Sequence, residues 1–119
     1  MERGRSDSTS ELLRACAHPT RLLILQELLD GPKCVTDIED LLSSRQPNIS
    51  QHLTVLRHAQ LVDFAQDGTL RCYYLSRPKF VRRILALLAE DEPVVKRSRD
   101  QIAALKRRRA KAACSRADA

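Results

Sequence analysis

The sequence is poor in aromatic residues, with no tryptophan, two phenylalanines and two tyrosines among 119 residues. The core must therefore be built from leucine, isoleucine, valine and alanine, which suits packed helices. No apolar run approaches the 18 or more residues of a membrane span, and no apolar signal segment stands near the N-terminus. We expect a soluble cytoplasmic protein with no membrane partner, too small for a large catalytic cleft.

The cysteines form no Cys-x-x-Cys pair, which excludes a zinc finger and a thioredoxin-like motif. They stand far apart, at Cys16, Cys34, Cys72 and Cys114, and should be free thiols in a reducing cytoplasm. Cys16 follows two leucines at helical spacing, so we expect it in the core. Cys114 lies in a polar tail and is expected to be incidental.

Charge is unevenly distributed along the chain. Residues 1–93 hold 12 Lys/Arg against 13 Asp/Glu, whereas residues 94–119 hold 9 against 2. We therefore divide the chain into a flexible N-terminus (1–9), one domain (10–92) and a basic tail (93–119). The tail either extends as a solvated helix or frays, and we expect its last ten residues to be disordered. The run Lys106–Arg109 predicts extra non-specific affinity for DNA.

The stretch 44–58 predicts a helix with one apolar and one unusual polar side. Ile49, Leu53 and Leu56 recur at helical spacing, and Pro47 in the first turn fixes the start of the helix. The opposite side carries amides and hydroxyls rather than the Glu and Lys of an ordinary solvated helix. Such side chains read base edges in a major groove, the alternative being plain solvated surface. Expected base contacts are Gln46, Asn48, Ser50 and Gln51, with Arg45 and Arg57 nearer phosphates.

The neighbouring segments complete a winged helix. Capping boxes predict helix starts at Ser8 and Thr36, and a further helix runs from about Pro19 to Asp30. After the polar helix, strands 61–65 and 70–75 flank a turn at Gln66–Thr69 whose Asp-Gly pair indicates a hairpin. Arg71 on this wing is a candidate phosphate or minor-groove contact, or simply solvated. The predicted class is mainly α with a small β-hairpin wing: a winged helix-turn-helix with five core helices and a basic C-terminal extension.

The last core helix, beginning at Ser76 to Pro78, is apolar on more than one stripe. A domain of this size cannot cover both sides, so a partner subunit is the economical explanation and a homodimer is expected. The expected dimer residues are Leu12, Leu13, Phe80, Ile84, Leu87 and Leu88.

Together these marks resemble the ArsR/SmtB family of winged-helix repressors over about residues 10–90. The resemblance rests on Ala17-His18-Pro19-Thr20-Arg21, Ser50-Gln51-His52-Leu53 with Leu56, Leu61-Val62, Asp67-Gly68 and Tyr73-Tyr74. It implies a homodimer joined through the first and last helices, bound to an inverted repeat of double-stranded DNA and released by an inducer, often a metal or metalloid ion.

The family's sensing motifs match poorly. Cys34 occupies the first place of a Cys-x-Cys thiol site, but Thr36 occupies the second, and residues 78–89 lack the His and carboxylate pairs of some zinc sensors. In a winged helix the segment before the third helix commonly pairs with the second wing strand, which would place Cys34 near Cys72. Two such thiols could bind arsenite, antimonite or another thiophilic ion, could oxidise as a pair, or could be unconnected. A regulator without ion sensing also stays open.

Two other classes compete with a regulator. A thiol enzyme would need Cys34 or Cys72 beside His18, His52 or His58 in a pocket. His52 lies beside the apolar stripe and is expected to be structural. A single-stranded RNA module would need exposed stacking aromatics, which are too few here.

Overall fold

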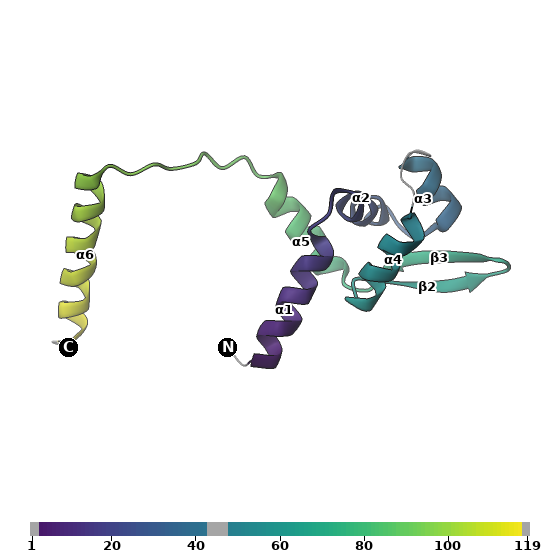
Figure 1. Ribbon diagram of the computed structural model, residues 1–119, viewed down its shortest axis with the longest axis horizontal. Helices are drawn as coiled ribbons and strands as arrows, with labels where there is room; N and C mark the ends of the chain where they lie inside the picture. Colours follow the sequence, from purple (N-terminus) through teal and green to yellow (C-terminus); the bar gives the residue numbers. More distant parts are fainter. Residues whose placement is uncertain (1–2, 43–47, 118–119) are drawn as a thin grey trace.

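The computed structural model describes residues 3–42 and 48–117, with side chains described for 7–42 and 48–113. Five helices and a small three-stranded sheet form the body, and a sixth helix stands apart from it (Figure 1). This confirms the predicted winged helix-turn-helix class. The elements are α1 (Arg3–Cys16), α2 (Pro19–Leu28), β1 (Lys33–Cys34), α3 (Val35–Leu41), α4 (Ile49–His58), β2 (Val62–Asp67), β3 (Leu70–Leu75), α5 (Pro78–Ala89) and α6 (Arg99–Ala117).

Two predicted capping boxes are wrong. Helix α1 begins at Arg3, so Ser8 lies inside the helix, and residues 3–9 of the expected loose N-terminus are helical. Helix α3 begins at Val35 with Cys34 as its N-cap, and the Cys34 side chain makes no capping hydrogen bond. Thr36 is therefore an exposed residue of the first turn. A capping box is a local pattern, and the actual starts depend on the packing of the whole helix.

The helix-turn-helix is formed by α3 and α4, as predicted. The apolar stripe of α4, Ile49, Leu53 and Leu56, is buried. The helix starts at Ile49 after the N-cap Asn48, rather than with Pro47 in its first turn; Pro47 itself lies outside the described residues. Asn48 has a φ of +76°, a left-handed conformation that asparagine tolerates better than most residues.

The wing is an antiparallel hairpin of β2 and β3. The hairpin is longer than predicted, because Gln66 pairs with Arg71 and Asp67 with Leu70. Only Gly68 and Thr69 remain in the loop, and the positive φ of Gly68 (+64°) is the conformation that glycine adopts without strain. Strand β1 adds to the far edge of β3, giving the order β1-β3-β2.

One hydrophobic core joins α1 to α5 and the wing, and it includes Cys16 as predicted. Its buried members are Ala15, Cys16, Ile24, Leu25, Leu28, Ile38, Ile49, Leu53, Leu56, Leu61, Val62, Tyr73 and Val81. The core is almost wholly aliphatic, in agreement with the scarcity of aromatic residues.

The C-terminal part departs from the prediction of a disordered end. An extended stretch, 90–98, leads to α6, which continues to Ala117 (Figure 1). Residues 110–117, expected to be disordered, are thus helical, since alanine, arginine and lysine are strong helix formers. The division into domain and tail stays a prediction. No helix among the described residues is long and apolar enough to cross a membrane.

Candidate DNA-binding surface and thiol pair

The polar side of α4 is open to solvent. Asn48, Ser50 and Gln51 are exposed, as is Thr54, whose hydroxyl donates a hydrogen bond to the Ser50 carbonyl at 2.9 Å. The other two predicted contacts, Arg45 and Gln46, lie outside the described residues. The exposed, uncharged face that the sequence predicted is therefore present, and the side chains of Asn48, Ser50 and Gln51 on it are accessible to base edges.

A hollow of about 450 Å³ separates this helix from the wing. Ser50 and Thr54 line it from α4, and Arg71 lines it from β3 together with other wing residues. The fold thus brings two predicted DNA contacts, Ser50 and Arg71, to one concave surface. The Ser50 hydroxyl and the Arg71 guanidinium both donate hydrogen bonds, so together they suit a phosphate oxygen.

Phe64 organises the two arginines beside this surface. The guanidinium carbons of Arg57 and Arg71 lie 4.4 and 4.5 Å from the centre of its ring. Arg57 also donates to the Asp63 carboxylate at 3.0 Å. The hydrogen bond from the Phe64 backbone N–H, followed by that from Arg57, lowers the pKa of Asp63. Arg57, predicted to contact phosphate, is therefore tied to the start of the wing.

The sequence did not predict that Phe64 and Asp63 position the arginines, with Phe64 contacting Arg57 and Arg71 and Asp63 pairing with Arg57. The contact between Phe64 and Arg71 could have been predicted from the alternation of side chains along the hairpin. Phe64 pairs with Tyr73, and Arg71 lies on the same face of β3 as Tyr73. The contact with Arg57 comes from a different element and has no local signature.

His18, Arg21 and His52 join three helices. The Nδ1 atom of His18 accepts the Thr20 N–H at 3.1 Å and caps α2. Arg21 donates to the Ala15 carbonyl at 2.7 Å, at the end of α1, and its Nη1 lies 3.5 Å from Nδ1 of His52 on α4. The two imidazole rings are 4.4 Å apart. Loss of hydration lowers the pKa of His52, and His18 and Arg21 lower it further.

We expect the domain to lose stability as the pH falls below about 6.5, the ordinary pKa of histidine. His52 is harder to protonate in the folded state, so the unfolded chain takes up more protons in this range and the free energy of unfolding falls with it. Thermal unfolding between pH 7.5 and 5.5 measures this. His52→Asn should flatten the dependence, and His58→Asn, an exposed position on the same helix, should not; equal curves for wild type and His52→Asn would contradict the assignment.

Cys34 and Cys72 lie opposite each other across β1 and β3, as the sequence predicted. Their sulfur atoms are 2.7 Å apart, and both residues are free cysteines. The shared hydrogen bond raises the pKa of Cys34 to about 11, with reduced hydration and the carboxylates of Asp37 and Asp67 adding to the shift. Within the described ranges no group of three or more His, Cys, Asp or Glu could hold a metal ion.

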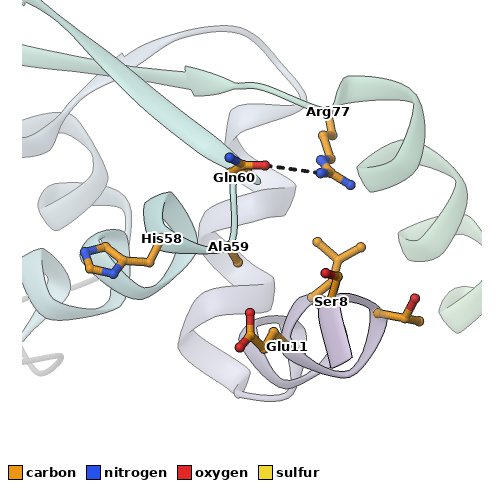
Figure 2. A pocket seen from close by; sticks show the side chains of 8 residues that line it. Ser8, Glu11, His58, Ala59, Gln60 and Arg77 are labelled. Carbon is orange, nitrogen blue, oxygen red and sulfur yellow. Dashed lines mark hydrogen bonds between the residues drawn. The ribbon is translucent and has the colours of Figure 1, made fainter. Parts of the chain in front are cut away.

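The structure also places the other cysteines and His58, the remaining histidine candidate for a thiol enzyme. Cys16 is buried, and burial raises the pKa of its thiol. The side chain of Cys114 lies outside the described residues. His58 lines a hollow of about 370 Å³ with Glu11 of α1 and Arg77 at the start of α5 (Figure 2), and no cysteine lines this hollow. Gln60, also there, accepts a 3.5 Å hydrogen bond from Arg77. Among the residues that the structure describes, this hollow therefore lacks the thiol that a cysteine enzyme would need beside His58.

A helix-turn-helix with an exposed polar second helix, followed by a hairpin wing, defines a winged helix-turn-helix DNA-binding protein. Comparison with known proteins identifies the family within this class. The family model described as "Bacterial regulatory protein, arsR family" matches residues 18–63. The chain belongs to this family, whose members are transcription regulators rather than enzymes.

Similar proteins span most of the chain. An uncharacterized HTH-type transcriptional regulator of Methanocaldococcus jannaschii is 38% identical over 85 residues, covering 71% of this chain and 94% of that protein. The biofilm growth-associated repressor of Agrobacterium fabrum is 39% identical over 85 residues, covering 71% and 73%. The structure of HlyU from Vibrio cholerae matches with a TM-score of 0.67 and 31% identity, covering 76% of this chain and 100% of HlyU.

Proposed function

We propose that this protein is a homodimeric, sequence-specific transcriptional repressor that binds an inverted repeat and is released from it by an inducer. The observation that carries the proposal is the exposed, uncharged face of α4 beside Arg71 of the wing. Base-edge readers and a phosphate contact on neighbouring elements are what a specific complex needs. Repression is supported by the name of the Agrobacterium relative. Selection of bound sequences from random duplex DNA tests the proposal.

The homodimer is supported by apolar side chains that the fold leaves uncovered. Leu87 and Leu88 at the end of α5 are 64% and 60% exposed, and Leu13 of α1 is 50% exposed. The other proposed dimer residues, Leu12, Phe80 and Ile84, are half-buried. Exposed leucines clustered on the last turn of a helix mark an interaction site more often than solvated surface.

The inducer site we propose is the pair Cys34 and Cys72. The pair connects the start of the helix-turn-helix to the wing, so a bond between the two thiols acts on both DNA-contacting elements. Arsenite, antimonite or another thiophilic ion is one class of inducer for two thiols, and an oxidant is the other. An inducer releases DNA only to the extent that it prefers the released conformation.

Helix α6 should add non-specific DNA affinity. Lys106–Arg109 are exposed, and the helix reaches away from the body on the stretch 90–98 (Figure 1). Removal of residues 106–119 should flatten the salt dependence of operator binding and leave sequence preference intact. The log–log slope should fall by about 0.9 for each DNA phosphate that the shortened protein no longer neutralises.

A full-length variant with Lys106–Arg109 changed to glutamine is the matched control, and it should reproduce most of the change in slope. An unchanged slope in both proteins, measured by gel shift over a salt series, would show that α6 does not touch the DNA.

A further inference from the structure

We infer that Cys34 and Cys72 form a reversible dithiol–disulfide pair at the base of the wing, and that closing the disulfide lowers operator affinity. The inference rests on the proposed function, because it assumes operator binding, and it chooses oxidation over ion binding as the event at this site.

The register of the sheet makes the disulfide possible without backbone movement. Residues directly opposite in an antiparallel pair have Cα atoms about 4.5 or 5.5 Å apart, and a disulfide needs about 4.4–6.8 Å. Cys34 and Cys72 are such a pair, on the edge strand β1 and the central strand β3. Tyr73, the next residue along β3, is buried, so Cys72 faces the opposite, more open side, where a small reagent can reach it.

The same geometry disfavours an ion. Two thiolates bound to one tetrahedral ion, each about 2.3 Å from it, lie roughly 3.8 Å apart, whereas these sulfurs are already in contact at 2.7 Å. Within the described residues no third ligand joins them. Asp37 and Asp67 also oppose the thiolate form that an ion needs, since they help to raise the pKa of Cys34. Thiol–disulfide exchange needs a thiolate only at the moment of attack, whereas a bound ion needs both thiolates for as long as it stays, and the disulfide that forms carries no charge for these carboxylates to repel.

The oxidant is a low-molecular-weight disulfide, and the reaction balances as thiol–disulfide exchange. The thiolate of one cysteine attacks the reagent, forms a mixed disulfide and expels one thiol. The second cysteine attacks the mixed disulfide and expels the other. The protein loses two protons and two electrons, and the reagent takes them up and is reduced to two thiols.

The bond reaches the DNA-binding surface through two short connections. Cys34 is the N-cap of α3, the first helix of the helix-turn-helix. Cys72 adjoins Arg71, which contacts Phe64 and lines the hollow facing Ser50. A disulfide therefore ties the start of α3 to the wing strand that carries Arg71, and it limits how far the wing can adjust relative to α4 when DNA binds. Couplings between sites of this kind typically change affinity by about 5- to 150-fold, and we expect a loss of at least tenfold.

The test compares the full-length protein in dithiothreitol with the same protein in oxidised glutathione. Peptide mapping after alkylation should find Cys34 linked to Cys72 within one chain, and dithiothreitol should reverse the link. The linked protein should unfold at a temperature higher by roughly 10 °C, because the bond closes a long loop. Its affinity for the selected operator should be at least tenfold lower.

Cysteine variants and added ions distinguish disulfide formation from ion binding at this pair. Cys34→Ser and Cys72→Ser should bind the operator like the reduced wild type under both conditions, whereas Cys114→Ser should keep the full response. An oxidised wild type without the link, a link that leaves operator affinity unchanged, or release by arsenite or cadmium but not by oxidised glutathione would each overturn the inference. Because mapping and unfolding score the link without DNA, a reduced protein that shows no sequence preference overturns the proposed function instead.

Discussion

Replacing Gln51 by alanine should lower affinity for the selected operator at least tenfold and leave binding to random DNA nearly unchanged. Gln51 is exposed on the polar side of α4, and a glutamine amide pairs with an adenine edge at about 1–3 kcal/mol of discrimination per contact. A two-fold dimer makes each contact twice. Gln51 is a cleaner test than Asn48, because the left-handed backbone of Asn48 means that alanine there also introduces strain.

Two further variants serve as comparisons for Gln51→Ala. Gln26→Ala removes an exposed glutamine from α2, outside the proposed surface, and should change neither affinity. Arg71→Ala should weaken specific and random binding about equally, because a phosphate contact carries no sequence information. Gel shifts with both DNAs provide the measurement. If Gln51→Ala and Arg71→Ala both leave operator binding unchanged, α4 is not the helix that reads DNA.

Changing Leu87 and Leu88 together to glutamate should convert the dimer to a monomer and reduce operator binding at least a hundredfold. These are the most exposed leucines of α5, while Val81 on the same helix is fully buried and holds the helix to its own core. Burying two carboxylates in an apolar interface is strongly unfavourable, and a monomer can read only one half of an inverted repeat. Analytical ultracentrifugation at micromolar concentration measures the assembly directly.

Leu105→Glu is the matched control, since it alters an exposed leucine on α6. It should remain dimeric. Circular dichroism should show that the α5 variant keeps its helices, because the two leucines contribute nothing to the buried core. A wild-type protein that sediments as a monomer without DNA would refute the homodimer.

The sequence was most informative where neighbouring elements constrain one another. The helix-turn-helix, the hairpin and the approach of Cys34 to Cys72 follow from the order and spacing of short segments, because a hairpin has few possible registers once its turn is known. Cys72 was predicted to lie near Cys34 because the segment before the third helix of a winged helix commonly pairs with the second wing strand, and the structure shows this register.

The sequence was least informative where side chains from distant elements meet. Arg21 caps α1 and approaches His52, 31 residues away, and no periodicity marks such a contact. The capping boxes at Ser8 and Thr36 failed for the opposite reason: a three-residue pattern was given more weight than the helix around it. The end of α6 is a separate case, since there the helix propensity of its alanines and arginines, a local property, outweighs the polarity that suggested disorder.

The central claim is that α4 of a dimer reads a specific DNA sequence, and footprinting on DNA selected from a random pool tests it most directly. The reduced full-length protein should enrich an inverted repeat and protect two half-sites whose centres lie about 34–36 Å, or a multiple of this, apart along the duplex. Gln51→Ala should lose this protection at concentrations where the wild type is saturated. Enrichment of no sequence, or uniform protection that depends only on salt, would contradict the claim.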